Sequence, residues 1–220
     1  MPTKFHSELF YMKQRAQIFI SIVTVVYFAI LSAPSFSMGN TLSKRSDYSY
    51  VDKKNWINPE ALDEALKHYD REKDSLQNPH YLTVIDFSLH SSKKRLYLID
   101  MRDGDVEKYH TAHGTGSDRN NDGIAEQFSN TSGSHQSSLG LYETAETYYG
   151  RNGYSLRLDG LSSTNSRARP RAIVIHPANY IDSRRNKVGR SWGCPALDPS
   201  VSRSIITRIK NGSLIYAWKR

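Results

Sequence analysis

The sequence is poorest in cysteine, which occurs once in 220 residues, as Cys194. A single cysteine has no partner in the chain, so a disulfide framework is excluded. A free cysteine is most often a small buried hydrophobic residue. In an exported protein, however, an unpaired cysteine indicates a reactive thiol. Cys194 also follows a Ser-Trp-Gly turn instead of lying in an apolar run, which favours the reactive thiol.

Features of nucleic-acid binding are missing as well. The net charge is +8, yet the sequence contains no dense run of Lys and Arg and no usual nucleic-acid motif. A basic surface can attract nucleic acid, anionic lipid or an acidic polymer, and it can also be ordinary surface charge. Because the chain looks exported, we expect no nucleic-acid partner.

Metal-binding patterns are weak. No zinc-like spacing relates the histidines at 110, 113, 135 and 176. The segment 118–126 matches the first part of an EF-hand loop through Asp118, Asn120 and Asp122, with glycine at the sixth position. Ser129 stands where such a loop carries its bidentate acid. We therefore expect a polar turn that needs no calcium, no metal site and no cofactor.

One long apolar run is present, at residues 18–31, and it is shorter than the roughly 20 residues of a membrane span. Basic residues precede it and small residues follow it at 32–37. This order predicts a secretory signal peptide, residues 1–37, that is cleaved after Ser37. An uncleaved anchor is the alternative. We expect an exported monomer in the periplasm or cell envelope, in contact with the membrane only through this segment before cleavage.

The rest of the chain divides into a short lead-in and a strand-rich domain. Residues 38–79 are predicted as a polar lead-in and a helix that begins at Asn58-Pro59 and ends at Asn78-Pro79. Residues 80–220 are predicted as the catalytic domain, with one helix from Asp198-Pro199 to Lys210. Many strands with few helices predict a mainly β (α+β) fold with flanking helices. The expected strands are 81–87, 95–100, 106–112, 137–144, 154–158, 171–176 and 213–218.

The candidate site centres on Cys194 and on His176, which ends a predicted strand upstream of it. A thiol is nucleophilic as the thiolate, and an imidazole can take its proton. We expect pairing with His176 to lower the pKa of Cys194. Gly193 allows a sharp turn, and the N–H groups of Gly193 and Cys194 are expected to face a developing oxyanion.

The pattern Ser191-x-Gly193-Cys194, after a strand ending in histidine, resembles the signature of the L,D-transpeptidase (YkuD-like) family, in its murein L,D-transpeptidase catalytic domain branch. The resemblance covers about residues 80–218. Six ordered segments carry it: Ala112-His113-Gly114, Phe128-Ser-Asn130, Ser137-Ser-Leu-Gly140-Leu-Tyr142, Ser155-Leu-Arg-Leu-Asp-Gly160-Leu, Arg171-Ala-Ile-Val-Ile-His176 and Gly189-Arg-Ser-Trp-Gly-Cys-Pro-Ala196.

The resemblance implies a curled mixed β-sandwich that brings Cys194 and His176 together in a cleft. It implies acyl transfer on peptidoglycan stem peptides: Cys194 attacks the carbonyl between the third residue, a diamino acid, and D-Ala. D-Ala then leaves with a proton from His176, and the thioester passes to an amine of another stem, giving a 3→3 cross-link, or of a protein. With water as acceptor the same site is an L,D-carboxypeptidase. A non-catalytic murein-binding module is the remaining alternative.

The sequence departs from the family pattern at two positions. Pro177 follows His176, where glycine is expected, and Ala196 stands where many members carry arginine. Arg190 and Arg157 are therefore candidates to bind a substrate carboxylate, because a guanidinium fits a carboxylate.

His113-Gly114-Thr115 imitates the His-Gly-Thr that carries the base in other members of the superfamily. Its place in the order of the family's segments matches an earlier strand, which forms one wall of the site. His176 is therefore the predicted base, and His113 is not. The predicted catalytic residues are Cys194, His176, Gly193 and Ser191. The predicted substrate-binding residues are Arg190, Arg157, Trp192 and His113.

Overall fold

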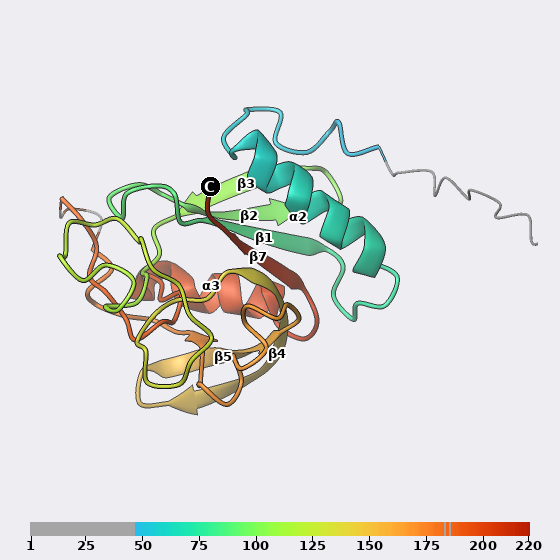
Figure 1. Ribbon diagram of the computed structural model, residues 1–220. Helices are drawn as coiled ribbons and strands as arrows, with labels where there is room; N and C mark the ends of the chain where they lie inside the picture. Colours follow the sequence, from blue (N-terminus) through green and yellow to red (C-terminus); the bar gives the residue numbers. More distant parts are fainter. Residues whose placement is uncertain (1–46, 183, 185) are drawn as a thin grey trace, which may run out of the picture. The chain divides into compact units, whose positions relative to one another are not determined.

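The computed structural model describes residues 47–182, 184 and 186–220. The predicted signal peptide, residues 1–37, lies outside this range. The elements, drawn in Figure 1, are α2 (Pro59–Glu72), β1 (Tyr81–Asp86), β2 (Leu96–Asp100), β3 (Val106–Tyr109), β4 (Gly140–Gly150), β5 (Gly153–Gly160), β6 (Val174–Ile175), α3 (Pro199–Ile209) and β7 (Leu214–Trp218).

The seven strands form one curled mixed sheet in the order β3-β2-β1-β7-β4-β5-β6. The β1–β7 pair is parallel, with Leu82 opposite Leu214, and all other pairs are antiparallel. The predicted mainly β fold with a curled mixed arrangement and few helices is confirmed for the described residues. In this order β3 and β6 are the two edges of the sheet, so they lie far apart in it.

Strand alternation divides the core between two faces of the sheet. On β1, Leu82 and Val84 pack with the buried face of α2, whereas Ile85 belongs to the cluster that contains Ile205 and Ile206 of α3. Successive side chains of a strand point to opposite faces, so a single strand can serve both layers. Figure 1 shows the result, with α2 covering one side of β1–β3 and α3 lying within the curve between β7 and β5.

The helix beginnings follow the predicted caps. Asn58 accepts hydrogen bonds from the N–H groups of Glu60 and Ala61 at the start of α2, and Asp198 accepts one from Ser200 N–H at the start of α3. The predicted end of the first helix at Asn78-Pro79 is wrong, because α2 ends at Glu72. Asn78 has a different role: its amide donates to the carbonyls of Arg208 and Lys210 at the end of α3.

The predicted strand 137–144 lies too early, because β4 begins at Gly140, where φ is +108°, and continues to Gly150. The register against β5 shifts between Thr144 and Thr147, so the strand continues through an irregularity that interrupts its alternation. The polar and aromatic residues of its second half obscured this continuation in the sequence.

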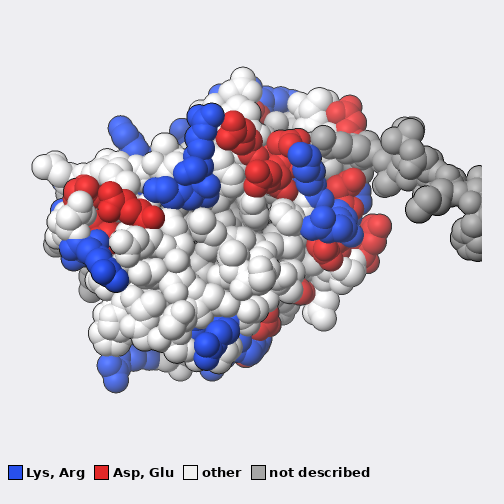
Figure 2. Space-filling model, viewed as in Figure 1, with Lys and Arg blue, Asp and Glu red and all other residues white. Residues whose placement is uncertain are grey.

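Charges of both signs are interspersed over the α2 side of the molecule, as Figure 2 shows. They include the ion pair between Lys67 and Asp63, at 2.5 Å. Exposed pairs of this kind contribute little to stability. Among the described residues, no helix combines the length and the apolar character that a membrane crossing requires.

Candidate active site

The segment carrying His176 lies directly beside the segment carrying Cys194. Leu197 N–H donates to the His176 carbonyl at 2.9 Å, and Ala178 N–H donates to the Leu197 carbonyl at 2.8 Å. The Cys194 thiol donates to the Ala172 carbonyl, with 3.6 Å between Sγ and the oxygen. These contacts place the sulfur against the strand that leads to His176. The two predicted catalytic segments, separate in sequence, are therefore neighbours in the fold.

His176 is held in one tautomer. Its side chain is buried, and Nδ1 lies 2.9 Å from the Pro177 carbonyl oxygen. A carbonyl only accepts, so Nδ1 carries the proton and Nε2 presents a lone pair. Burial lowers the pKa of His176 and so favours the neutral ring. The hydrogen bond to the Pro177 carbonyl acts in the opposite direction but is the smaller effect. The site thus uses the carbonyl of Pro177, and the N–H that proline lacks is not needed for this contact.

The surroundings of the Cys194 thiol favour its protonated form. Burial raises the pKa of Cys194 above its ordinary value, while the Val174 N–H and the Arg171 guanidinium oppose this rise. The expectation of a low pKa in the resting protein is therefore wrong. The physical reason is that the half-buried sulfur lies against the segment that leads into β6, and desolvation of a thiolate there outweighs the available stabilisation. The surroundings of the Cys194 thiol and of the His176 imidazole thus both favour the neutral form.

We call residues 191–194 the nucleophile turn, because they carry Cys194, the predicted nucleophile. Ser191 closes this turn. Its Oγ donates to the Cys194 carbonyl at 2.7 Å and accepts from Gly193 N–H at 3.0 Å. The expectation that Gly193 N–H faces the oxyanion is wrong, because this group is already bonded within the turn. Cys194 N–H has no hydrogen-bond acceptor in the described part of the chain, so it is the backbone donor that remains for a substrate oxygen.

Gly193 is required for a steric reason. Its φ is +120°, and a Cβ at this position would lie 2.6 Å from the Gln136 carbonyl oxygen. The loop that carries Gln136 also supports the turn, because Ser137 Oγ donates to the Gly193 carbonyl and accepts from Gly114 N–H, each at 3.1 Å. A larger residue at 193 would displace either the turn or this loop.

Arg171 is a residue whose role sequence reasoning missed. Its guanidinium donates to the carbonyls of Ser129 and Gln136, each at 2.7 Å, and so ties the 129–138 loop to the turn before β6. The same cation acts on the Cys194 sulfur. The predicted strand 171–176 is shorter in the structure, where β6 covers only Val174–Ile175. An arginine at the start of one of the family-like segments was the available signal.

His113 lies in a buried network instead of facing the sulfur. Its Nδ1 is 2.9 Å from an Arg95 nitrogen, and its Nε2 is 3.1 Å from Asp118 Oδ2. Arginine only donates, so Nδ1 accepts and Nε2–H donates to the carboxylate. Burial and the Arg95 charge lower the pKa of His113 to about 4. With both ring nitrogens bonded, His113 is a neutral structural link between two buried charges.

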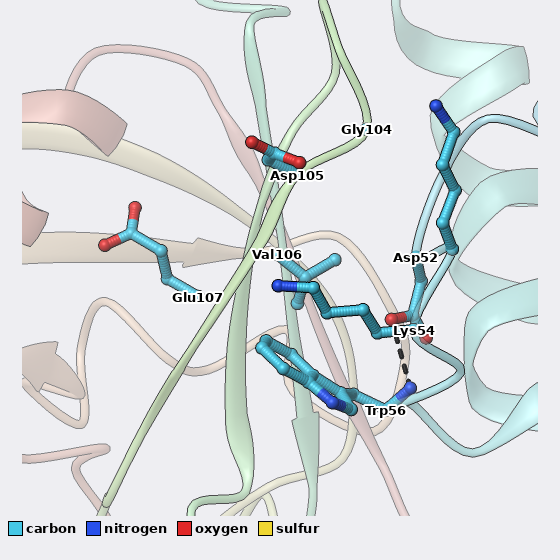
Figure 3. Close-up of a pocket in the computed structure, with 8 residues that line it drawn as sticks. Asp52, Lys54, Trp56, Gly104, Asp105, Val106 and Glu107 are labelled. Atoms are coloured by element: carbon cyan, nitrogen blue, oxygen red, sulfur yellow. Dashed lines mark hydrogen bonds between the residues drawn. The ribbon is translucent and has the colours of Figure 1, made fainter.

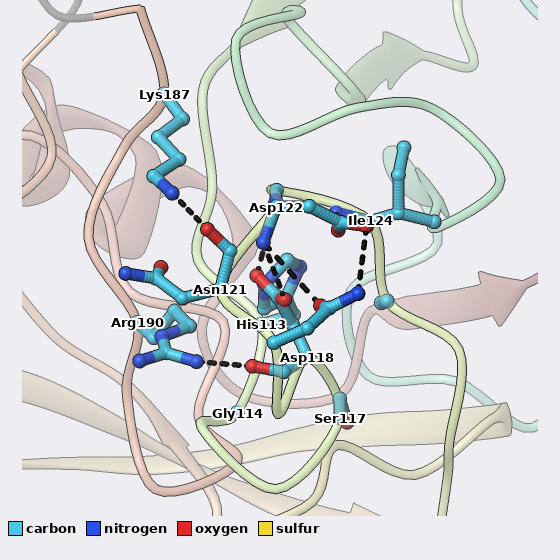
Figure 4. A network of polar contacts seen from close by, with 12 residues as sticks. His113, Gly114, Ser117, Asp118, Asn121, Asp122, Ile124, Lys187 and Arg190 are labelled. Carbon is cyan, nitrogen blue, oxygen red and sulfur yellow. Dashed lines mark hydrogen bonds and ion pairs between the residues drawn. The ribbon is translucent and has the colours of Figure 1, made fainter.

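Asp118 closes the loop that resembles a calcium site, as Figure 4 shows. Its Oδ1 accepts from Asp122 N–H and its Oδ2 from Gly123 N–H, each at 3.0 Å. Backbone N–H groups and His113 thus occupy the carboxylate that would be the first calcium ligand. No group of three or more His, Cys, Asp or Glu residues suited to a metal occurs among residues 47–182, 184 and 186–220.

The predicted substrate-binding residues have different surroundings. Arg190 donates to the Asp118 carbonyl (Figure 4), and Arg157 pairs with Glu146 at 3.0 Å while lying over the Tyr148 ring. The guanidinium of Arg157 is therefore already engaged. Trp192 is 73% exposed and stacks on the His135 ring with centroids 4.7 Å apart. Of these residues, Trp192 is the one with an open face beside the nucleophile turn.

A cavity of about 240 Å³ lies at the other edge of the sheet, beside β3. Trp56, Lys54 and Glu107 are among its lining residues, and Figure 3 shows how they surround it. Lys54 and Lys108 place their ammonium groups 4.7 and 3.8 Å from the Trp56 ring centroid. None of the residues that line this cavity belongs to the cysteine site, so the two are separate.

Comparison with known proteins gives one decisive match. The family model of the L,D-transpeptidase catalytic domain matches residues 53–218. This range includes α2, which packs on the same sheet as the predicted catalytic domain. No match is found among curated proteins.

Solved structures give more distant matches, each 12% identical to this chain. An L,D-transpeptidase from Mycobacterium smegmatis has a TM-score of 0.40 and covers 63% of this chain and 58% of its own. An L,D-transpeptidase from Stackebrandtia nassauensis has a TM-score of 0.39, with 70% and 66% covered. Pgp2, a helical cell shape determining protein from Campylobacter jejuni, has 0.39, with 64% and 48% covered. The chain thus spans less than two thirds of these relatives.

Proposed function

The chain belongs to the L,D-transpeptidase catalytic domain family and is an enzyme of this class, and on that basis we propose the reaction that it catalyses. The reaction is cysteine-dependent acyl transfer on peptidoglycan stem peptides, through a thioester on Cys194. The observation that carries the proposal is the placement of Cys194 Sγ against the strand that ends in His176, whose Nε2 is left as the acceptor.

In the first half-reaction the Cys194 thiol gives its proton to His176 Nε2. The sulfur attacks the carbonyl carbon between the third residue of a tetrapeptide stem, a diamino acid, and D-Ala. Cys194 N–H donates to the resulting oxyanion. The carbon–nitrogen bond then breaks, and His176 returns the proton to the amine of D-Ala, which leaves as a neutral amino group.

In the second half-reaction an amine attacks the thioester carbonyl and loses its proton to His176. The carbon–sulfur bond breaks, the new amide forms, and the proton returns to Cys194. Another stem as acceptor gives a 3→3 cross-link, and a protein amine gives an attachment. With water the product is a tripeptide stem and the enzyme acts as an L,D-carboxypeptidase.

The neutral resting pair supports a mechanism in which His176 acts as a general base at the moment of attack. A preformed ion pair would need the opposite pKa directions for both residues. The Arg171 guanidinium and the Val174 N–H favour the transient thiolate. Trp192, with one ring face against His135 and the other open, is proposed to contact the stem beside the scissile bond.

The same proposal includes location and organisation. A substrate in the cell wall requires export, and residues 1–37 are proposed as the cleaved signal peptide, leaving a monomeric enzyme in the periplasm or cell envelope. N-terminal sequencing of the envelope form tests the cleavage. Met1 retained in a membrane fraction would mean that the segment is an anchor.

The decisive experiment incubates the protein with tetrapeptide muropeptides and reads the products by mass spectrometry. We expect release of D-Ala, a transient adduct on Cys194, and a cross-linked dimer or a tripeptide. Cys194→Ala should lose turnover by at least about 10⁴-fold, because the covalent route is removed. An unchanged substrate with a correctly folded wild-type protein would leave the non-catalytic murein-binding module as the better explanation.

A further inference from the structure

We infer that the protein carries a second surface, outside the catalytic pair, that binds the anionic glycan–peptide polymer of the cell wall. We call it the tyrosine–arginine surface and define it as Tyr149, Arg151, Tyr154, Arg203 and Lys210. The inference rests on the proposed function, because that function identifies the polymer as the substrate. Its own support is the arrangement of these five side chains.

The core of the surface is built from two elements. Tyr149 and Tyr154 flank the β4–β5 turn, with ring centroids 5.3 Å apart at an interplanar angle of 44°. Arg203 of α3 donates to Tyr149 Oη at 3.0 Å, and its guanidinium carbon lies 4.9 Å from the Tyr154 centroid. These contacts hold the rings before any partner arrives, so less side-chain entropy is lost on binding.

Exposure distinguishes this group from ordinary packing. Tyr149 is 72% exposed and is one of three large hydrophobic side chains that are exposed in the described part of the chain. Its ring therefore contributes little apolar burial to the core. Tyrosine and arginine are the residue types that carry most of the energy of binding interfaces. An isolated exposed tyrosine is unremarkable, but a tyrosine pair fixed by an arginine is a prepared contact surface.

The surface lies near the segment that carries His176. A Cβ added to Gly153, in the β4–β5 turn, would lie 3.6 Å from Pro177 Cγ, so the turn lies against the residue that follows His176. The pairing of Leu156 with Ile175 then joins β5 to the strand that carries the base. A polymer chain bound at His176 is therefore close enough to reach Tyr154 and Tyr149 as well.

Charge identifies the class of partner. Arg151 is exposed at the turn, and Lys210 is the C-cap residue of α3, the helix that carries Arg203. Figure 2 shows several basic side chains along the lower edge of the molecule, where β4 and β5 lie, with acidic side chains beside some of them. A polymer of sugar rings with stem carboxylates supplies both complements, because ring faces pack on tyrosine and carboxylates pair with guanidinium groups.

The test is co-sedimentation of the mature protein with purified, insoluble peptidoglycan. The variant is Tyr149→Ala combined with Arg203→Glu, both at exposed positions. Arg220→Glu is the matched charge control, because its exposed guanidinium pairs with Glu60 at the α2 side. Leu161→Ala is the matched control for the apolar contact, since Leu161 is 48% exposed and outside the surface. Melting temperatures verify folding.

We expect the double variant to bind the polymer roughly tenfold more weakly, as loss of a hot-spot contact does, and both controls to bind normally. Turnover of a soluble tetrapeptide should stay within twofold, because these residues do not touch the reacting bond. Unchanged polymer binding would overturn the inference. If binding to vesicles of anionic lipid depends more strongly on the same two residues than binding to the polymer does, the inference is also overturned, because these residues would then bind a membrane.

The outcome separates the two proposals. If the wild type fails to process the tetrapeptide but sediments through Tyr149 and Arg203, the surface stands and the catalytic proposal fails. If the wild type is active and the double variant loses turnover of the soluble tetrapeptide in parallel with sedimentation, the residues belong to the catalytic cleft and a separate surface is excluded.

Discussion

His176 and His113 lie near the same turn, and their difference explains how the site is built. Both are buried, at 5% and 1% exposure, and burial is the largest cause of the lowered pKa of each. They differ in their hydrogen bonds. His176 uses Nδ1 for the Pro177 carbonyl and leaves Nε2 without a protein partner in the described chain, whereas His113 uses both nitrogens.

The comparison teaches that burial alone does not identify a base. A general base needs a nitrogen that can gain and lose a proton during the reaction. His113 would break its bond from Arg95 if Nδ1 were protonated, and a buried cation would be left facing another. His176 meets no such obstacle. The local partners, and not the degree of desolvation, distinguish the proposed base His176 from the structural His113.

Within the comparison of the two histidines, the largest expected effect comes from His176→Ala. We expect kcat to fall by roughly 10²–10⁴-fold, the usual contribution of a general acid–base, with the melting temperature nearly unchanged. The measurement is steady-state release of D-Ala from a soluble tetrapeptide. His113→Gln is the matched control and should retain most activity. If His113→Gln loses the activity and His176→Ala keeps it, the assignment of the two histidines is reversed.

The next effect concerns stability. His113→Ala should lower the free energy of unfolding by about 3 kcal/mol, because it leaves the buried Asp118 and Arg95 charges without their link. Chemical denaturation of both variants measures this. His113→Gln should recover part of the loss, since its amide can both accept and donate. Equal stability of His113→Ala and wild type would show that the network is not important for folding.

The pH dependence of the free energy of unfolding tests the same network without a substitution that leaves a cavity. His113 has a pKa of about 4 in the folded protein and ordinarily about 6.5, so the unfolded chain binds more protons between these values. The neutral His113 ring therefore contributes to the stability of the folded protein. This contribution is complete above pH 6.5 and is lost as the pH falls toward 4. It amounts to on the order of 3 kcal/mol. His176 acts in the same direction.

Denaturation from pH 7 to pH 4 checks this expectation. His113→Gln should flatten most of the slope, and the remainder should be sensitive to His176→Gln. A slope that neither variant changes would place the acid sensitivity in other groups.

The smallest expected effect is on the thiol itself. Because burial raises the pKa of Cys194, its alkylation by iodoacetamide should show a midpoint above the ordinary value of about 8.5. The chain has one cysteine, so the label reports on this site alone, and a short unstructured cysteine peptide is the reference. A midpoint well below that of the peptide would restore the model of a preformed ion pair.

Much of the fold follows from local rules. The caps Asn58-Pro59 and Asp198-Pro199 marked both helix starts, because a side-chain acceptor before a proline satisfies N–H groups that no helical carbonyl reaches. The end of α2 was misjudged because nothing in the sequence shows that Asn78 is used at the end of α3. That contact joins residues 130 apart in sequence, and local patterns contain no information on it.

By itself, the sequence determined the candidate residues of the site: a single cysteine after Ser191-Trp192-Gly193, and His176 after a short strand. Residue types and their order suffice for this, since the chemistry of a thiol and an imidazole is intrinsic. Only the tertiary structure decided their states. The pKa of Cys194, the tautomer of His176, the use of Gly193 N–H within the turn and the engagement of His113 by Arg95 and Asp118 depend on desolvation and on partners brought together through space. Those quantities arise only when the chain has folded.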